Sequence, residues 1–355
     1  MQEISLCMIV KDEENVIGRC LESVRDIADE IIIVDTGSTD RTKEIVSQYT
    51  DKIFDFEWVD DFAKARNFSF SKATKDYLLW LDADDVILEK DYQKFIELKK
   101  NLDTSVDIYM MKYNYILDKG GNPTLVQNRE RLLKREKHYQ WVSPIHEVII
   151  PEGKVENVDI AITHKKEEIK DLNRNLNILE RMIKSGQELD DRQEYSYAKE
   201  LFCLQRYEKA KDAYEQFIAK YQKQYSNERW LLYSAILELS DCYKYLEDSE
   251  KCLEYLFTIL KYEVPGPECC CKIGSVFLEK KEYETAKFWF EIALQNNEKL
   301  KESINVDYNE FIPYLSLCVC YYWMGDMKKS NDYNEKAGKI KPKDETYLQN
   351  KTYFI

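Results

Sequence analysis

Several features common in binding and catalytic proteins are missing from this sequence of 355 residues. No apolar run approaches the roughly 20 residues that a membrane-spanning helix needs. The first twelve residues, MQEISLCMIVKD, are too short and too acidic for a signal peptide. Neither G-x-G-x-x-G nor G-x-x-x-x-G-K occurs, which disfavours dinucleotide-binding and P-loop domains. We therefore expect a cytoplasmic protein without an integral membrane segment.

Metal-binding cysteine pairs are also missing, and no basic stripe offsets the negative charge of the chain. None of the ten cysteines forms a C-x-x-C motif, so neither a zinc site nor a disulfide framework is expected. The formal net charge of −14 argues against a partner that is nucleic acid or an anionic membrane. Only three histidines are present, His138, His146 and His164, and all lie near the middle of the chain. With so few histidines, their position is informative.

A strongly apolar stretch that ends in three carboxylates dominates the first half of the chain. Residues 77–81 (YLLWL) have the length and composition of a buried central strand, and Asp82, Asp84 and Asp85 follow. In open α/β sheets, ligands bind beyond the carboxyl ends of the strands. Asp82 and Asp84 offer the oxygen ligands that Mg2+ or Mn2+ takes while it also holds phosphates. For an isolated D-x-D, a strand followed by an acidic helix cap is the alternative.

The segments before this motif predict alternating strands and helices. Buried strands are expected at 4–10 and 30–34, and apolar residues from Glu14 onward recur at helical spacing between them. A third strand is expected at 52–58, where apolar and polar residues alternate. The second strand ends at Asp35, in the sequence DTGSTDRT, which provides a tight turn and a helix cap. An acid and free backbone N–H groups at a strand end suit a nucleotide base or ribose.

Four motifs in this order make the first half resemble a family 2 glycosyltransferase of the GT-A fold. They are CMIVKDEE at 7–14, VDTGSTD at 34–40, DDFAKARN at 60–67 and WLDADD at 80–85. The resemblance covers about residues 1–170 and implies an α/β, Rossmann-like nucleotide-diphospho-sugar transferase domain. Within that family the chain is similar to cytosolic enzymes with an I-V-K-N-E-E opening, in which asparagine stands where this chain has Asp12.

The resemblance also implies roles for individual residues. Asp35 would contact the uracil of a UDP-sugar, with Arg66 nearby and Glu13 lining the nucleotide pocket. Asp82 would touch the ribose or a metal-bound water, and Asp84 would bind the Mn2+ or Mg2+ that bridges the diphosphate. Such a metal neutralises the charge that develops on departing UDP. From the residues alone, Arg66 is either an exposed surface arginine or a phosphate or base contact.

The sequence YQWVSPIHEVII carries the expected general base. Members of the family have an adjacent His-Glu pair here, which implies that Glu147 deprotonates the acceptor in an inverting transfer and that His146 contacts the metal or diphosphate. Neighbouring side chains on a strand point to opposite faces, so both reach one site only where the backbone is irregular, as Pro144 allows. His164, which ends a strand-like segment at 155–164, is a second candidate metal ligand. The sequence does not choose between the two histidines.

Between these motifs we expect a helix at 89–102, a strand at 106–117, a turn at 120–123 and a short basic strand, RERLLKR, at 129–135. The basic side chains of that last strand could meet an acceptor or face solvent, and exposure to solvent is the favoured interpretation. His138, which follows it, is expected at the surface.

The composition changes after residue 165, where Leu, Tyr, Glu and Lys become dominant. An amphipathic helix at 170–186 ends at a glycine and is expected to pack on the first domain as a connector. Beyond it, small residues recur in pairs twelve positions apart: Ala198 and Ala210, Ser240 and Cys252, Gly274 and Ala286, Cys318 and Ser330. This spacing resembles about four tetratricopeptide repeats, which are helical hairpins. We therefore expect domains at 1–168 and 191–355, joined by a connecting helix at 169–190.

Together these features predict a metal-dependent, inverting glycosyltransferase. It would move a hexose of the glucose or N-acetylglucosamine type from a UDP-sugar to a peptide, protein or surface-glycan acceptor. Similar enzymes modify bacteriocin peptides or extend envelope glycans, and the helical repeats suggest a peptide or protein acceptor or a homodimer interface. One alternative is a repeat scaffold whose first domain binds a nucleotide sugar without turnover. Another is a nucleotidyltransferase, which would need a basic glycine-rich loop that the KDEE opening does not supply.

Overall fold

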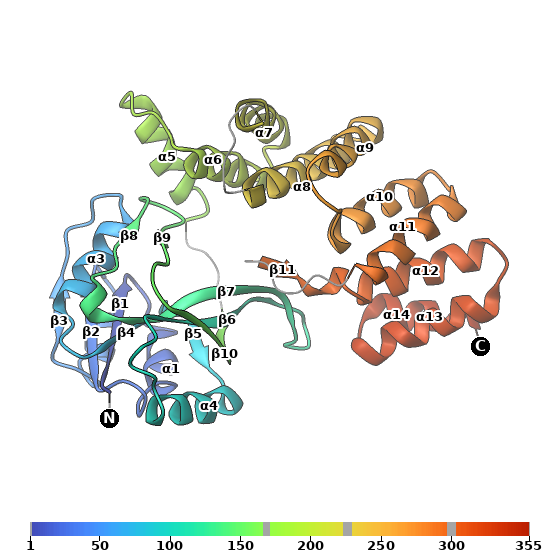
Figure 1. Ribbon diagram of the computed structural model, residues 1–355. Helices are drawn as coiled ribbons and strands as arrows, with labels where there is room; N and C mark the ends of the chain where they lie inside the picture. Colours follow the sequence, from blue (N-terminus) through green and yellow to red (C-terminus); the bar gives the residue numbers. More distant parts are fainter. Residues whose placement is uncertain (1, 166–170, 223–228, 297–302, 355) are drawn as a thin grey trace. The chain divides into compact units, whose positions relative to one another are not determined.

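The computed structural model describes residues 2–165, 171–222, 229–296 and 303–354, which divide into two units (Figure 1). The first unit contains Met1–Asp118, Leu125–Leu172 and Glu302–Ile304, and the second contains Lys119–Thr124, Asn173–Lys301 and Asn305–Ile355. The expected boundary between residues 168 and 169 lies outside the described residues, and so does the start of the connecting helix. The domain limits 1–168, 169–190 and 191–355 stay a prediction.

The first unit is built on a mixed sheet with the strand order β3-β2-β1-β4-β7-β6-β10-β5. Its first four strands run parallel to one another: β1 (Ile4–Val10), β2 (Glu30–Asp35), β3 (Ile53–Asp55) and β4 (Tyr77–Trp80). The third strand is shorter than the predicted 52–58, because its neighbour β2 ends at Asp35, which lies opposite Asp55. The carboxyl ends of β1, β2 and β4 therefore meet at one edge of the sheet.

The remaining strands bring a distant segment to that edge. They are β5 (Asp85–Ile87), β6 (Ile108–Leu117), β7 (Pro123–Lys134), β10 (Val155–His164) and, paired with β7, β11 (Ser303–Asn305). β7 runs antiparallel to β4, and β10 runs parallel to β6 and antiparallel to β5. In the last of these pairs, His164 lies opposite Asp85. The end of β10 is thus held next to the acidic motif.

Helices cover both faces of this sheet. They are α1 (Ile17–Glu22), α2 (Thr42–Val46), α3 (Phe62–Lys72) and α4 (Glu89–Lys100). Leu6 and Met8 of β1 share a core with α1 and α4, whereas Cys7 shares a second core with α3. Successive strand side chains point to opposite faces, so a continuous apolar strand packs against both helical layers. The α/β architecture predicted for the first half of the chain is confirmed.

A small two-stranded sheet completes the first unit. It consists of β8 (Trp141–Val142) and β9 (Val148–Ile149), and it follows a short 3-10 helix, η1 (Arg135–Lys137). Its Trp141 and Ile149 are buried in the same core as Phe70 of α3. The segment between the two strands carries the His-Glu pair.

The second unit is helical. Its longer helices are α5 (Arg174–Lys184), α6 (Asp191–Cys203), α7 (Tyr207–Tyr221), α8 (Arg229–Tyr245), α9 (Ser249–Thr258), α10 (Pro267–Glu279), α11 (Tyr283–Gln295), α12 (Phe311–Trp323), α13 (Met327–Ile340) and α14 (Glu345–Lys351). Short 3-10 segments are η2 (Ile259–Lys261), η3 (Val306–Tyr308) and η4 (Thr352–Phe354). Across the described part of the chain, no helix combines the length and the apolar character that crossing a membrane requires.

The same tight turn joins the two helices of each predicted repeat. A residue with a left-handed backbone ends the first helix in all four: Gln205, Glu247, Lys281 and Gly325. The N–H group of the next residue donates to the carbonyl five positions back, at 2.9 Å in every case. A left-handed residue followed by this hydrogen bond is characteristic of the Schellman motif, which satisfies carbonyl groups at the end of a helix. The four-hairpin pattern predicted from the sequence is confirmed.

The small residues of the repeats allow the paired helices to approach closely. Ala198 and Ala210 are fully buried. A Cβ atom on Gly274 would lie 3.0 Å from the ring of Phe290, so a larger residue here would require that ring to shift by a few tenths of an ångström. In the last repeat the Ser330 hydroxyl donates to the Cys318 carbonyl at 2.7 Å. The last two pairs therefore mark close contacts between two helices.

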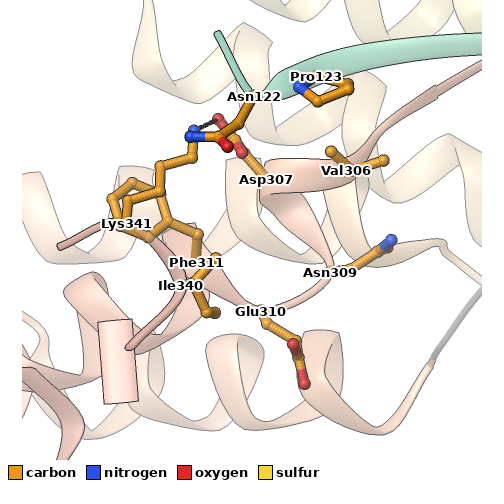
Figure 2. A pocket seen from close by; sticks show the side chains of 9 residues that line it. All are labelled: Asn122, Pro123, Val306, Asp307, Asn309, Glu310, Phe311, Ile340 and Lys341. Atoms are coloured by element: carbon orange, nitrogen blue, oxygen red, sulfur yellow. Dashed lines mark hydrogen bonds and ion pairs between the residues drawn. The ribbon is translucent and has the colours of Figure 1, made fainter. Parts of the chain in front are cut away.

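The second unit also contains the connecting helix and a pocket. Leu176 of α5 is buried in the same core as residues of α6–α10, so this helix packs with the repeats, and the expected packing on the first domain stays a prediction. A pocket of about 470 Å³ is lined by residues of the 119–124 segment, the 306–311 segment, Ile340 and Lys341 (Figure 2). In it the ammonium group of Lys341 pairs with Asp307 at 2.7 Å and lies over the Phe311 ring.

Candidate active site

The acidic motif forms a tight turn between β4 and β5. The N–H group of Asp82 donates to Oδ2 of Asp85 at 3.1 Å, and the N–H group of Asp85 donates to the Asp82 carbonyl at 3.0 Å. Asp85 is fully buried, whereas the side chains of Asp82 and Asp84 are 34% and 24% exposed. The turn therefore presents two carboxylates to solvent and uses the third internally.

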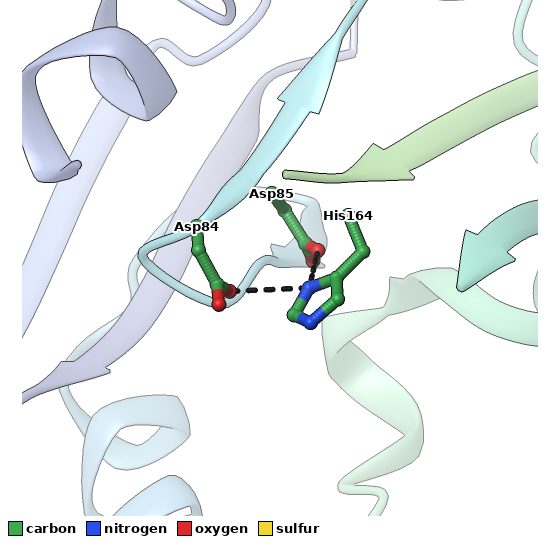
Figure 3. Close-up of side chains that lie close together, drawn as sticks. All are labelled: Asp84, Asp85 and His164. Carbon is green, nitrogen blue, oxygen red and sulfur yellow. Dashed lines mark hydrogen bonds and ion pairs between the residues drawn. The ribbon is translucent and has the colours of Figure 1, made fainter. Parts of the chain in front are cut away.

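His164 lies against this turn (Figure 3). Its Nδ1 atom is 3.2 Å from Oδ1 of Asp84 and 3.4 Å from Oδ1 of Asp85. Candidate ligand atoms of the three residues all lie within 4.8 Å of one another. Burial lowers the pKa of His164, but hydrogen bonds with Asp84 and Asp85 outweigh it and raise the pKa to about 9. The ring thus carries a positive charge between carboxylates, in the place where a metal cation would be favourable.

The chemistry of these groups fits a divalent metal. Carboxylate oxygens suit Mg2+ and Mn2+, and imidazole is a common metal ligand once it has lost its proton. Asp85 is the weaker candidate of the three, because its Oδ2 already accepts from Arg131 and from a backbone N–H group. Asp84 and His164 are therefore the side chains of this group best able to hold the ion.

Arg66 of α3 links the acidic turn to the predicted base. Its Nη2 donates to Oδ1 of Asp82 at 2.7 Å, and its Nε donates to Oε1 of Glu147 at 2.6 Å. The residue is only 8% exposed, so its interpretation as a surface arginine is wrong. Burial raises the pKa of Asp82, but the charges of Arg66 and Arg131 outweigh this effect and lower the pKa to about 2. Asp82 is consequently a carboxylate at neutral pH.

Glu147 reaches Arg66 because the backbone around it is irregular. The backbone is left-handed at Ser143 (φ 78°) and His146 (φ 48°), between the short strands β8 and β9. The side chain of Glu147 is 12% exposed and faces Arg66, whereas His146 is exposed. The group of metal-binding side chains found among the described residues contains His164 and not His146. Both metal roles stay predictions, and the geometry favours His164.

Asp35 and the loop after it form the other side of the candidate site. Oδ1 of Asp35 accepts the N–H groups of Gly37 and Ser38, at 2.9 Å each. Its Oδ2 atom is buried and has no hydrogen-bond partner within the described part of the chain. Gly37, with φ 104°, makes this turn possible because only glycine adopts that backbone freely. A buried acceptor that lacks a donor is suited to one supplied by a ligand.

Two of the motifs singled out in the sequence hold each other in place. The N–H group of Asp12 donates to Oγ of Ser38 at 3.0 Å, and that of Glu13 donates to Oγ1 of Thr42 at 2.7 Å. Asp12 in turn accepts the N–H group of Thr39 at 2.7 Å. Its backbone is left-handed (φ 54°), a conformation that Asp and Asn tolerate better than most residues. The KDEE and GSTDRT motifs therefore build one loop pair beside Asp35.

The sequence interpretation missed Arg131 and Tyr113. Arg131 belongs to the basic strand that was expected to face solvent, yet it is fully buried and pairs with Asp85 at 3.0 Å. The hydroxyl group of Tyr113 lies 3.0 Å from Nδ1 of His164. A possible signal was the third carboxylate of the DADD motif, to which no role was given. A buried acid at that point requires a buried cation, and the basic strand supplies it.

Known proteins resemble parts of the chain. The glycosyl transferase family 2 model matches residues 5–157. A TPR repeat-containing protein of Synechococcus elongatus is 36% identical over 149 residues, or 42% of this chain and 36% of the relative. The lipopolysaccharide core biosynthesis glycosyltransferase LpsC of Rhizobium meliloti is 32% identical over 161 residues, 43% of this chain and 59% of the relative.

A third relative aligns over more of the chain. The SPbeta prophage-derived glycosyltransferase SunS of Bacillus subtilis is 26% identical over 247 residues, which is 66% of this chain and 57% of the relative. The chain thus spans less than two thirds of the length of each of these three proteins. Residues 5–157, most of which lie within the first unit, thus match a glycosyltransferase family 2 domain, and a helical unit of tetratricopeptide-like repeats follows it.

Proposed function

We propose that the protein is a metal-dependent, inverting glycosyltransferase that transfers a hexose from a UDP-sugar to a peptide, protein or surface-glycan acceptor. The observation that carries the proposal is the placement of Asp84 and His164 side by side at the carboxyl end of the parallel strands. Arg66 pairs with Asp82 of the same turn and with Glu147, so both residues are connected to this group. The family match to residues 5–157 supports a sugar-transfer reaction at this edge of the sheet.

Asp84 and His164 would hold the Mn2+ or Mg2+ ion. When bound, such an ion acts as a Lewis acid that stabilises negative charge on a departing nucleoside diphosphate. Asp82 and Arg66 would position the ribose and diphosphate, since a guanidinium binds phosphate oxygens in a bidentate manner. Asp35 would accept a hydrogen bond from the uracil ring through its unpartnered Oδ2, and Glu13 would line the same pocket. His146 would contact the diphosphate from its exposed loop.

Glu147 would act as the general base. A carboxylate in this position accepts the proton of the acceptor nucleophile as that nucleophile attacks the anomeric carbon. In the structure its Oε1 receives the Nε–H group of Arg66, which fixes the orientation of the carboxylate. The glucose or N-acetylglucosamine type of sugar and a homodimer through the repeats stay predictions.

The proposal is tested by titrating UDP into the purified protein in a calorimeter, first with Mn2+ and then with EDTA. We expect micromolar binding that requires the metal and is weaker in an Asp84→Ala variant. The matched control is Asp159→Ala, which removes an exposed carboxylate that pairs with Lys94 and Lys112; its affinity for UDP should equal that of the wild type. Absence of binding with and without Mn2+ would contradict the UDP assignment and point to a different nucleotide.

A further inference from the structure

A fully buried ion pair lies directly beneath the acidic turn. Nη1 of Arg131, on β7, is 3.0 Å from Oδ2 of Asp85, and both side chains are completely inaccessible to solvent. The same Nη1 donates to the carbonyl of Trp80, the last residue of β4, at 3.1 Å. The pair therefore ties β7 to the end of β4 and to the start of β5, the two strands between which the turn is formed.

Asp85 also contacts the turn and the histidine that are proposed to hold the metal. Its Oδ2 accepts the N–H group of Asp82, and its Oδ1 lies 3.4 Å from Nδ1 of His164. Asp84 is the covalent neighbour of Asp85 and faces the same His164 nitrogen (Figure 3). Moving the Asp85 carboxylate would thus displace the backbone of the turn and the imidazole ring together.

Arg131 is fixed by aromatic rings as well as by hydrogen bonds. Its guanidinium lies 3.7 Å from the centre of the Trp80 ring and 4.3 Å from the centre of the Tyr113 ring. Its Nε and Nη2 atoms have no hydrogen-bond partner within the described residues, so the two ring faces are their main neighbours. Tyr113 also reaches His164 through its hydroxyl group, at 3.0 Å. Arg131 and His164 are therefore linked by two routes, Asp85 and Tyr113.

We propose that Arg131 and Asp85 are positioning residues, which set the places of Asp84 and His164 for a divalent metal without binding the ion or the substrate themselves. This inference rests on the proposed function, because it assumes a metal between those two residues. A buried ion pair that only stabilised the fold could be replaced by neutral side chains of similar size at little loss. A pair that orients metal ligands cannot, since partners behind the ligands typically change metal affinity 10- to 100-fold.

The test is a double variant, Asp85→Asn with Arg131→Met, which removes both charges and leaves no buried ion alone. Asparagine keeps an oxygen for the Asp82 N–H group, so we expect the double variant to melt closer to the wild type than either single variant does. At a fixed concentration of UDP, Mn2+ is titrated and free Mn2+ is followed by electron paramagnetic resonance. We expect the affinity for Mn2+ to fall about tenfold or more.

A second ion pair in the same unit, between the buried Lys99 and the exposed Asp29, provides a control at the other end of the strands. Lys99 of α4 pairs with Asp29 at 2.8 Å and donates to the carbonyl of Ile27 at 2.9 Å, and Asp29 accepts the N–H group of Ile4 at 2.8 Å. As in the pair of Arg131 and Asp85, the cation donates to a backbone carbonyl and the acid accepts a backbone N–H group. These contacts, however, lie at the amino ends of β1 and β2. The corresponding variant, Lys99→Met with Asp29→Asn, should keep the affinity for Mn2+ of the wild type.

The outcomes separate this inference from the proposed function. If the wild type fails to bind Mn2+ in the presence of UDP, both are wrong. If the wild type binds and the Asp85/Arg131 double variant binds equally well, only the positioning role is wrong. Should that variant fail to fold, Tyr113→Phe decides, because it removes a single hydroxyl group from the second route. An affinity for Mn2+ unchanged in Tyr113→Phe would then overturn the inference, and a loss of about tenfold would support it.

Discussion

The two ends of strand β2 carry buried acids with opposite surroundings. Glu30, at the amino end, is 6% exposed and accepts hydrogen bonds from Ser5, Lys52 and both the N–H and hydroxyl groups of Thr74. Asp35, at the carboxyl end, is 1% exposed and has one oxygen without any hydrogen-bond partner among the described residues. A satisfied acid stabilises the folded chain, whereas an unsatisfied one is available to a ligand.

The same contrast extends to two ion pairs of the first unit, of which only the pair of Arg131 and Asp85 is buried on both sides. The pair of Lys99 and Asp29 lies at the amino ends of the strands and joins α4 to the loop before β2. The pair of Arg131 and Asp85 lies at the carboxyl ends, behind side chains that are still partly exposed. In an open α/β sheet the carboxyl ends are where ligands bind. Substitutions at the carboxyl ends should therefore change activity, and substitutions at the amino ends should change the stability of the fold.

The largest effect is expected from Glu147→Gln at the carboxyl end. Removing a general base typically lowers turnover 10²- to 10⁴-fold, while the amide keeps an oxygen for the Arg66 contact. Transfer should therefore collapse, and calorimetry should still detect binding of UDP. Glu152→Gln, an exposed acid nearby in the chain, serves as the control and should transfer normally. Transfer that survives in Glu147→Gln would show that another group is the base.

The next effect is on stability in acid, through Glu30 at the amino end. Burial raises the pKa of Glu30, but the hydrogen bonds of Lys52, Ser5 and Thr74 outweigh it and lower the pKa from 4.5 to about 2. Because the folded-state pKa lies below the unfolded one, Glu30 stabilises the fold above pH 4.5 and this contribution is lost as the pH falls toward 2. A shift of this size corresponds to about 3 kcal/mol.

Urea unfolding of the wild type and of Glu30→Gln at several pH values measures this contribution. The variant should be less stable at neutral pH, and the gap between the two proteins should close as the pH falls below 4.5. Glu57→Gln, at an exposed position, should follow the wild type throughout. A gap that does not depend on pH would contradict the role given to the hydrogen bonds of Glu30.

A smaller effect is expected from Asp35→Asn. The amide keeps an oxygen for the Gly37 and Ser38 N–H groups, so thermal unfolding should change little. Replacing a charged acceptor by a neutral one should weaken the binding of UDP about tenfold, near 1.4 kcal/mol. Glu30→Gln is the reciprocal control, since it should leave the affinity for UDP unchanged. If Asp35→Asn alters stability and not affinity, the distinction between the two ends of β2 is wrong.

The sequence by itself determined the central strands of the first unit and the helical hairpins of the second. Apolar runs at 4–10 and 77–81 predicted central strands, because a strand packed on both faces has few polar residues. Small residues twelve apart predicted four helical hairpins, because partners in one hairpin are close in sequence and each unit repeats the same packing. These features depend on local spacing, so they could be read without a tertiary structure.

Only the tertiary structure decided which side chains of the candidate site meet. Arg66 and Glu147 are 81 residues apart, and His164 and Asp85 are 79 apart. The register of β10 against β5 selected His164 over His146 as the neighbour of Asp84. From its charge alone, Arg131 was expected to face solvent. Its partner Asp85 lies 46 residues earlier on a different strand, so local spacing does not reveal the pair. Charged residues become core residues only when the fold brings an opposite charge to them, and the sequence does not record that pairing.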